Sequence, residues 1–83
     1  SQIGINFVAS LISNVKWMAE QMKSMTQNMG DMMADEEIMN NNEHAAKIKK
    51  MHIIMEKTAM NFDQLIKINQ EMMHTMYQQA MDK

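Results

Sequence analysis

Hydrophobic residues recur along most of this sequence at alternating intervals of three and four. The first row consists of Val8, Leu11, Val15, Met18, Met22, Met25, Met29 and Met32. The second row consists of Ile48, Met51, Met55, Thr58, Phe62, Leu65, Asn69, Met72 and Met76. This alternation is the heptad pattern abcdefg, in which positions a and d form the apolar stripe of an amphipathic helix. The two rows constrain the chain to two long helices, and we assign Val8 and Ile48 to position a.

The composition agrees with an all-α fold. The 83 residues include no proline and only two glycines, so little in the chain would punctuate a fold of many strands. Methionine, glutamine, lysine and alanine are common, and all of them are good helix formers. The 14 methionines are unusual, because this residue normally serves as a sparing gap-filler in cores.

The heptad pattern fails after Met33, where residues 34–44 read ADEEIMNNNEH. Asparagine favours caps and turns, because its side chain competes for backbone hydrogen bonds. We therefore predict a single domain, 1–83, with a helix over about 5–38, a turn over about 39–42 and a helix over about 43–81. The alternative places the break at Gly30, with Asp35 capping a longer second helix.

Two helices of this length joined by a short turn form a long antiparallel hairpin. Apolar residues also occupy the neighbouring e and g positions: Phe7, Ile12, Ala19, Met33, Ile54, Ala59, Ile66, Ile68, Met73 and Ala80. One partner helix cannot cover so wide a stripe, and small cores need additional support. The sequence thus predicts a hairpin that dimerises into a four-helix bundle with coiled-coil-like packing. Asn69 at an a position would either fix register or sit where a helix end or water tolerates it.

Several function classes find no support. Without cysteine, the chain has no disulfides, no thiolate metal site and no cysteine nucleophile. The net charge is −2 and arginine is absent, which disfavours nucleic-acid binding. No apolar run approaches the length of a membrane span. A membrane-surface helix would need many basic residues on its polar face, but the first helix carries only Lys16 and Lys23.

The sequence also gives no reason to expect an enzyme. No histidine lies near Ser10, Ser13 or Ser24, and glycine-rich phosphate loops are absent. Glu71 and His74 have the Glu-x-x-His spacing of di-iron bundles. However, they occupy outward positions c and f, and the first helix offers no matching pair. We expect no catalytic residues and no cofactor.

The methionines allow one alternative to packing. Thioether sulfur is a soft ligand that suits Cu(I), and residues three and four apart on a helix lie side by side. The alternative hypothesis is a Cu(I)-binding or copper-storage bundle. Its candidate ligands are Met22, Met25, Met29, Met51, His52, Met55, Met72, Met73 and Met76. Most of these methionines also fall where any core residue would, so we favour packing.

The sequence as a whole predicts a non-catalytic helical oligomerisation or protein–protein interaction module with a methionine-rich heptad core. The expected partner is a second copy of the chain, with a dimer favoured, or another helical protein. The expected core and interface residues are Val8, Leu11, Val15, Met18, Met22, Met25, Met29, Met32, Ile48, Met51, Met55, Phe62, Leu65, Met72 and Met76. Because the sequence begins with Ser1, a removed leader stays an open alternative, and so do secreted, periplasmic and cytoplasmic locations.

Overall fold

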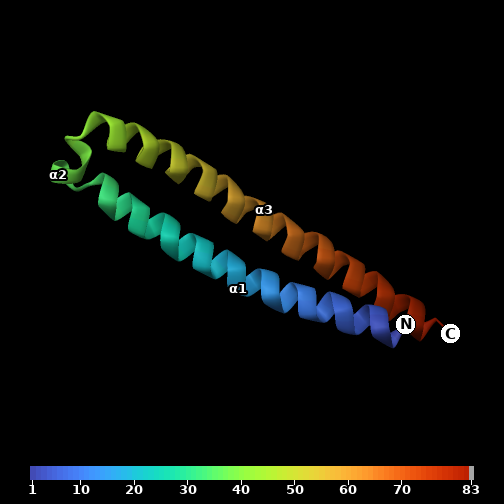
Figure 1. Cartoon of the computed structure of the whole chain (residues 1–83). Helices are drawn as coiled ribbons and strands as arrows, with labels where there is room; N and C mark the ends of the chain where they lie inside the picture. Colours follow the sequence, from blue (N-terminus) through green and yellow to red (C-terminus); the bar gives the residue numbers. More distant parts are fainter. Residues whose placement is uncertain (83) are drawn as a thin grey trace.

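The protein is an all-α helical hairpin, as predicted. The computed structural model describes residues 1–82. Two long helices, α1 (Gln2–Met33) and α3 (Asn42–Met81), run antiparallel and are joined by the one-turn helix α2 (Glu36–Met39) (Figure 1). Within residues 1–82 the structure contains no strand.

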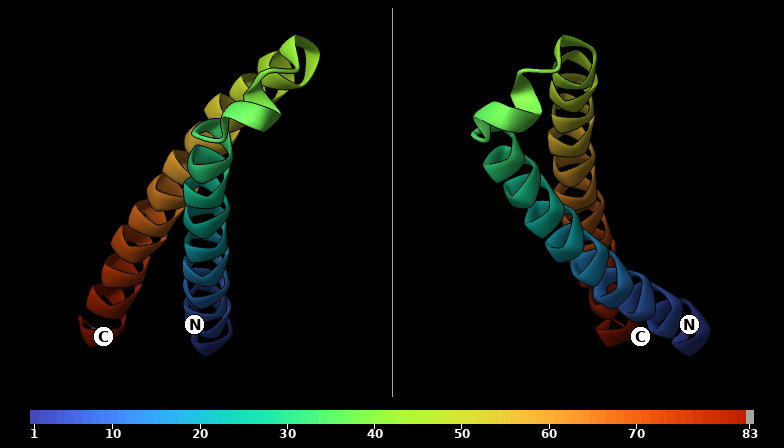
Figure 2. Two further views of the ribbon diagram at one scale, coloured as in Figure 1. Left: turned by 90° about the vertical axis from the view of Figure 1, so that its left-hand side faces the viewer. Right: turned by 60° about the vertical axis from the view of Figure 1, so that its left-hand side comes forward.

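The molecule is a rod. Its principal extents are 64 × 15 × 14 Å, and its radius of gyration is 18.7 Å. A compact domain of this length would have a radius of gyration of about 12 Å. Both termini lie at one end and the turn at the other, and the two long helices cross at an angle (Figures 1 and 2). Such a rod has a high ratio of surface to interior. In the described residues, no helix is apolar enough over enough of its length to span a membrane.

The turn differs in detail from the prediction. The first long helix ends at Met33, five residues before the expected end, and the residues after it form the separate helix α2. Two extended residues make the corners: Asp35 with φ −83° and ψ 111°, and Asn41 with φ −80° and ψ 103°. Gly30 lies inside α1, so the predicted alternative is wrong about the position of the break. Asp35 does form an N-cap, but it caps the four-residue helix α2 and not a longer second helix.

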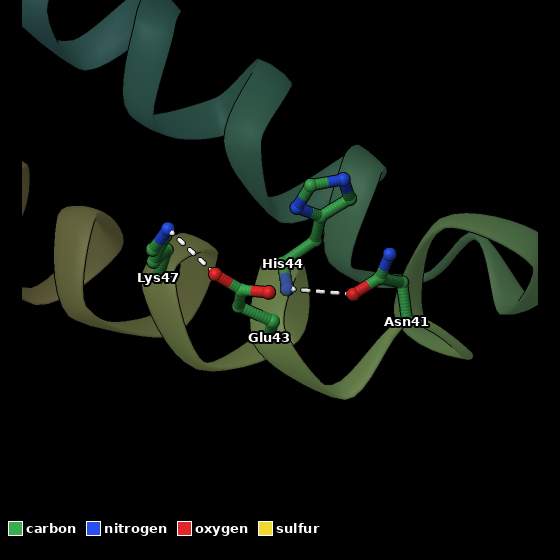
Figure 3. A network of polar contacts seen from close by, with 4 residues as sticks. All are labelled: Asn41, Glu43, His44 and Lys47. Carbon is green, nitrogen blue, oxygen red and sulfur yellow. Dashed lines mark hydrogen bonds and ion pairs between the residues drawn. The ribbon is translucent and has the colours of Figure 1, made fainter.

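Both corner residues form N-caps, which explains why the chain changes direction there. The Asp35 carboxylate accepts hydrogen bonds from the backbone N–H groups of Glu37 (3.0 Å) and Ile38 (3.3 Å). The Asn41 side-chain oxygen accepts one from the N–H of His44 at 3.0 Å (Figure 3). Each cap satisfies N–H groups that have no partner inside the helix, and each contributes about 1 kcal/mol.

The two long helices pack through positions a and e. The most buried residues of α1 are Val8, Val15 and Ala19, which are 1–3% exposed. In α3 they are Ile48, Ala59 and Asn69. We call this contact the seam. Its other members are half-buried: Ile12, Met22, Thr26, Met29 and Met33 in α1, and His52, Met55, Phe62, Ile66, Met73 and Met76 in α3.

Candidate protein-interaction surface

The structure divides the predicted interface residues into two groups. The a residues lie in the seam, but most d residues lie outside it. Met18 and Met25 of α1 are 38% and 47% exposed, although they share the heptad row of the buried Val8 and Val15. In α3, the d residues Met51, Leu65 and Met72 are 41–45% exposed. The hairpin therefore buries its a and e residues more deeply, and leaves most d residues partly exposed.

The exposed d rows of both helices lie on the same side of the hairpin. Two antiparallel helices that share seam letters are related by a pseudo-twofold axis passing through the seam from one side of the hairpin to the other. That axis exchanges α1 and α3 but maps each side of the hairpin onto itself. A given heptad position of α1 and the same position of α3 therefore lie on the same side of the hairpin. The contact between Lys23 and Asp63, both at b, agrees with this geometry. Their Nζ and Oδ1 atoms lie 3.1 Å apart and bridge the helices on the side opposite the d rows.

Large apolar side chains also occupy g, the next position round from d. Ile54 and Ile68 of α3 are 53% and 59% exposed, and Phe7 of α1 is 65% exposed. Together with the d rows they form a surface that we call the d–g face. Its apolar members are Phe7, Leu11, Met18, Met25 and Met32 of α1 and Met51, Ile54, Leu65, Ile68 and Met72 of α3. Polar residues with neutral side chains fill the remaining positions: Asn14, Gln21 and Asn28 in α1, and Thr58, Asn61 and Thr75 in α3.

The opposite side of the rod, at positions b and f, is much more polar. Seven charged residues lie there: Lys16, Glu20, Lys23, Lys49, Glu56, Asp63 and Lys67. Its large apolar residues are Ile53, Met60, Tyr77 and Met81, each at least half exposed. On the d–g face, by contrast, no d or g residue from Phe7 to Met32 or from Met51 to Thr75 is charged. The rod therefore has one apolar side and one charged side.

Asn69 is the one polar residue within the closely packed part of the seam, at 6% exposed. Its side-chain Nδ2 donates a hydrogen bond to the carbonyl of Leu65, one turn earlier in α3, at 2.7 Å. This bond lies within the helix itself and reaches no residue of α1. Because the amide of Asn69 makes its hydrogen bond within α3, it can lie in the seam without selecting a particular residue of α1.

The residues predicted as copper ligands are not gathered into one site. The Lys23–Asp63 contact sets the register of the helices and places Met29 close to the level of Met55 in the seam. At a rise of about 1.5 Å per residue, the cluster of Met72, Met73 and Met76 begins about 25 Å further along the rod. Met25, Met51 and Met72 lie on the exposed d–g face instead.

The histidine among these candidates already has a neighbour. His52 Nδ1 lies 2.8 Å from a carboxylate oxygen of Glu56, one turn later in α3. Residues 1–82 contain no group of three His, Cys, Asp or Glu side chains that could hold a metal ion. Copper binding therefore stays a prediction that gains no support from the geometry.

No protein-family model, curated protein or solved structure matches this chain. The functional interpretation therefore rests on its own residues. Among these, the predicted interface set omits Phe7, Ile54 and Ile68, which the structure places on the d–g face. Their signal is present in the sequence, because each is an apolar residue at a g position next to an apolar d row.

Proposed function

We propose that this chain is a non-catalytic helical oligomerisation module that acts through protein–protein contacts of the d–g face. The observation that carries the proposal is the continuity of that face. It follows both helices at heptad spacing and is free of charge, yet the hairpin covers it only in part. The favoured product is a homodimer with the architecture of a four-helix bundle.

The energetics support a partner on this face. Full burial of one large apolar side chain contributes about 1.5–3 kcal/mol, and the d–g face exposes ten such side chains to a large or moderate extent. Monomeric proteins rarely expose contiguous apolar patches beyond roughly 300–600 Å². A row along most of a 64 Å rod exceeds that size. Leaving this surface in water would forfeit stabilisation that a small hairpin needs.

The spacing of the face favours a helical partner over an extended peptide. Side chains that alternate at intervals of three and four leave holes that match the same pattern on another helix. An extended strand instead needs free backbone donors and acceptors, and helices satisfy theirs internally. A second copy of the chain and another helical protein both meet this requirement, and the same face would serve either one.

The test is the mass of the protein in solution, measured by sedimentation equilibrium across a range of concentrations. We expect twice the 9.7 kDa of the chain. Leu65→Asp places a charge within the d–g face, and we expect it to abolish the dimer. Met60→Asp is the matched control, because Met60 is exposed on the opposite side of the same helix. It should keep the dimer mass.

Two results would contradict the proposal. The first is a wild-type chain that stays helical and monomeric at high micromolar concentration. The second is a Leu65→Asp variant that keeps both its helicity and the dimer mass. Leu11→Asp on α1 provides an independent repeat of the experiment, because it alters the same face from the other helix.

A further inference from the structure

The α3 part of the d–g face has nearly the same character when it is followed in either direction from its centre. In order, its d and g residues are Met51, Ile54, Thr58, Asn61, Leu65, Ile68 and Met72. Asn61 lies in the middle, isoleucine lies seven residues away on each side, and Met51 and Met72 are the outermost apolar members, followed at g by Lys47 and Thr75. A row that is symmetric about its centre can pair with an antiparallel copy of itself.

The α1 part of the face has the same property. From Leu11 to Met32, its d and g residues are Leu11, Asn14, Met18, Gln21, Met25, Asn28 and Met32. Gln21 lies in the middle, methionine is the next member on each side, and asparagine lies seven residues away on each side. Antiparallel pairing of α1 with its own copy about Gln21 therefore places methionine beside methionine and asparagine beside asparagine.

The two centres of symmetry lie at about one level of the rod. Two contacts between the helices limit the register: the Nζ of Lys23 lies 3.1 Å from the Oδ1 of Asp63, and a Cβ on Gly4 would lie 3.3 Å from the Cε of Met76. The first contact alone would make Asn61 level with Met25, and the second would make it level with Ala19. Gln21 lies between these two residues of α1. A single axis can thus pass close to both centres, as an isologous dimer requires.

We propose that the partner on the d–g face is a second copy of this chain, turned end for end about a twofold axis at Asn61 and Gln21. This inference rests on the proposed function and adds the identity and orientation of the partner. In the dimer, each α3 packs antiparallel on the other α3, and each α1 packs on the other α1. Ile54 lies beside Ile68 of the second copy, and Met51 lies beside its Met72.

The charges at the edge of the face favour the same orientation. Position c of α3 carries Lys50, Lys57, Gln64 and Glu71. Antiparallel pairing about Asn61 brings each Lys50 beside Glu71 of the second copy, and each Lys57 beside Gln64. Parallel pairing of the two α3 helices would instead place lysine beside lysine and glutamate beside glutamate, which is repulsive.

The position of the axis also maximises the contact. Helix α3 spans Asn42–Met81, so Asn61 lies at its midpoint, and rods related by an axis there overlap along their whole length. A face 64 Å long and two helices wide covers on the order of 1,000 Å² per partner. Stable complexes typically bury about 800 Å² per partner. The available surface is sufficient for a stable dimer.

Single cysteines test the axis directly, because the chain has no natural cysteine. Asn61→Cys and Gln21→Cys should each form a disulfide dimer with itself under mild oxidation, since each residue meets its own copy at the axis. Ile54→Cys should not dimerise alone but should form a disulfide with Ile68→Cys when the two variants are mixed. The alternative twofold axis, along the rod, would place α1 over α3 of the copy. It would cross-link Gln21→Cys to Asn61→Cys only in the mixture, and that result would overturn the inference.

A second measurement leaves the face unaltered. Asn40 is exposed at the turn, so Asn40→Cys can carry a fluorescent or spin label away from the d–g face. The proposed dimer separates the two labels by about 60 Å, the length of the rod. The alternative axis puts both turns at one end, about 20 Å apart. A dimer with a short label distance overturns the orientation alone, whereas a monomer overturns the proposed function as well.

Discussion

Replacement of Asn69 by leucine should stabilise the protein, although Asn69 is among its most buried residues. The Asn69 side chain is 6% exposed, so its amide has lost almost all contact with water. Its one hydrogen bond within the chain goes to the carbonyl of Leu65. That carbonyl also accepts the backbone N–H of Asn69 in the helix, so removal of the side chain leaves no carbonyl without a partner.

The magnitude follows from three terms. Burial of a leucine side chain contributes about 1.5–3 kcal/mol. Burial of the asparagine amide costs about 1–3 kcal/mol, and its hydrogen bond returns about 1 kcal/mol. After an allowance for imperfect packing, Asn69→Leu should raise the free energy of unfolding by about 2 kcal/mol. For a chain of this length, that gain corresponds to an increase of about 10 °C in the melting temperature.

Thermal unfolding followed by circular dichroism measures the effect. Every variant is compared at one protein concentration, because dimerisation makes the melting temperature concentration-dependent. Gln70→Leu is the matched control: it converts the next amide in the chain to leucine on the exposed side of α3. We expect it to change stability by less than about 0.5 kcal/mol. A lower melting temperature for Asn69→Leu, with Gln70→Leu unchanged, would refute the reasoning and show that Asn69 makes a specific contribution to the seam.

Three further substitutions and one titration test other parts of the structure. Val8→Ala should lower stability by about 2 kcal/mol in chemical denaturation, because Val8 is 1% exposed, whereas the exposed Ile3→Ala should have almost no effect. Gly30→Ala should raise stability by about 1 kcal/mol, since Gly30 is helical and its added Cβ would meet no atom within 4 Å. Asn41→Ala should lower the melting temperature by several degrees through loss of a cap worth about 1 kcal/mol. An anaerobic Cu(I) titration against a competing chelator should show no tight stoichiometric binding; a thermal shift with Cu(I) but not Zn²⁺ would support the copper hypothesis instead.

The two helices and their antiparallel arrangement could be predicted from the sequence, because the heptad spacing is nearly unbroken and glycine and proline are scarce. The position of the break was harder to predict. Asn40, Asn41 and Asn42 indicate a turn, and Asn41 does cap α3. However, Asp35 competes with them as a cap, and its carboxylate accepts two backbone hydrogen bonds. Asp35 and Asn41 both act as N-caps, so the chain changes direction twice, with the short helix α2 between the two corners.

The choice between a/d and a/e packing could not be predicted from spacing. Both pairs of positions alternate at intervals of three and four, and a, d and e are all largely apolar in this chain. The size of the side chains at d and e explains why the hairpin packs through a and e. Ala19 and Ala59 at e let the two helix backbones approach closely, and both residues are buried in the seam. The neighbouring Met18 at d is larger and more flexible, and the hairpin leaves it exposed.

This division gives the methionines a physical role on both sides of each helix. Met22, Met29, Met33, Met55, Met73 and Met76 are half-buried in the seam, whereas Met18, Met25, Met32, Met51 and Met72 belong to the d–g face. An unbranched, flexible side chain can pack against α3 in one position and against a second molecule in another, without a fixed shape at either contact. Such adaptability weakens the selection of one oligomer over another by core shape. Orientation in the proposed dimer would then depend mainly on its less adaptable features, namely the symmetric placement of Ile54 and Ile68 and the opposite charges of Lys50 and Glu71. Exchange of that charge pair within one chain (Lys50→Glu with Glu71→Lys) preserves the pairing and should preserve the dimer, whereas Lys50→Glu alone should weaken it.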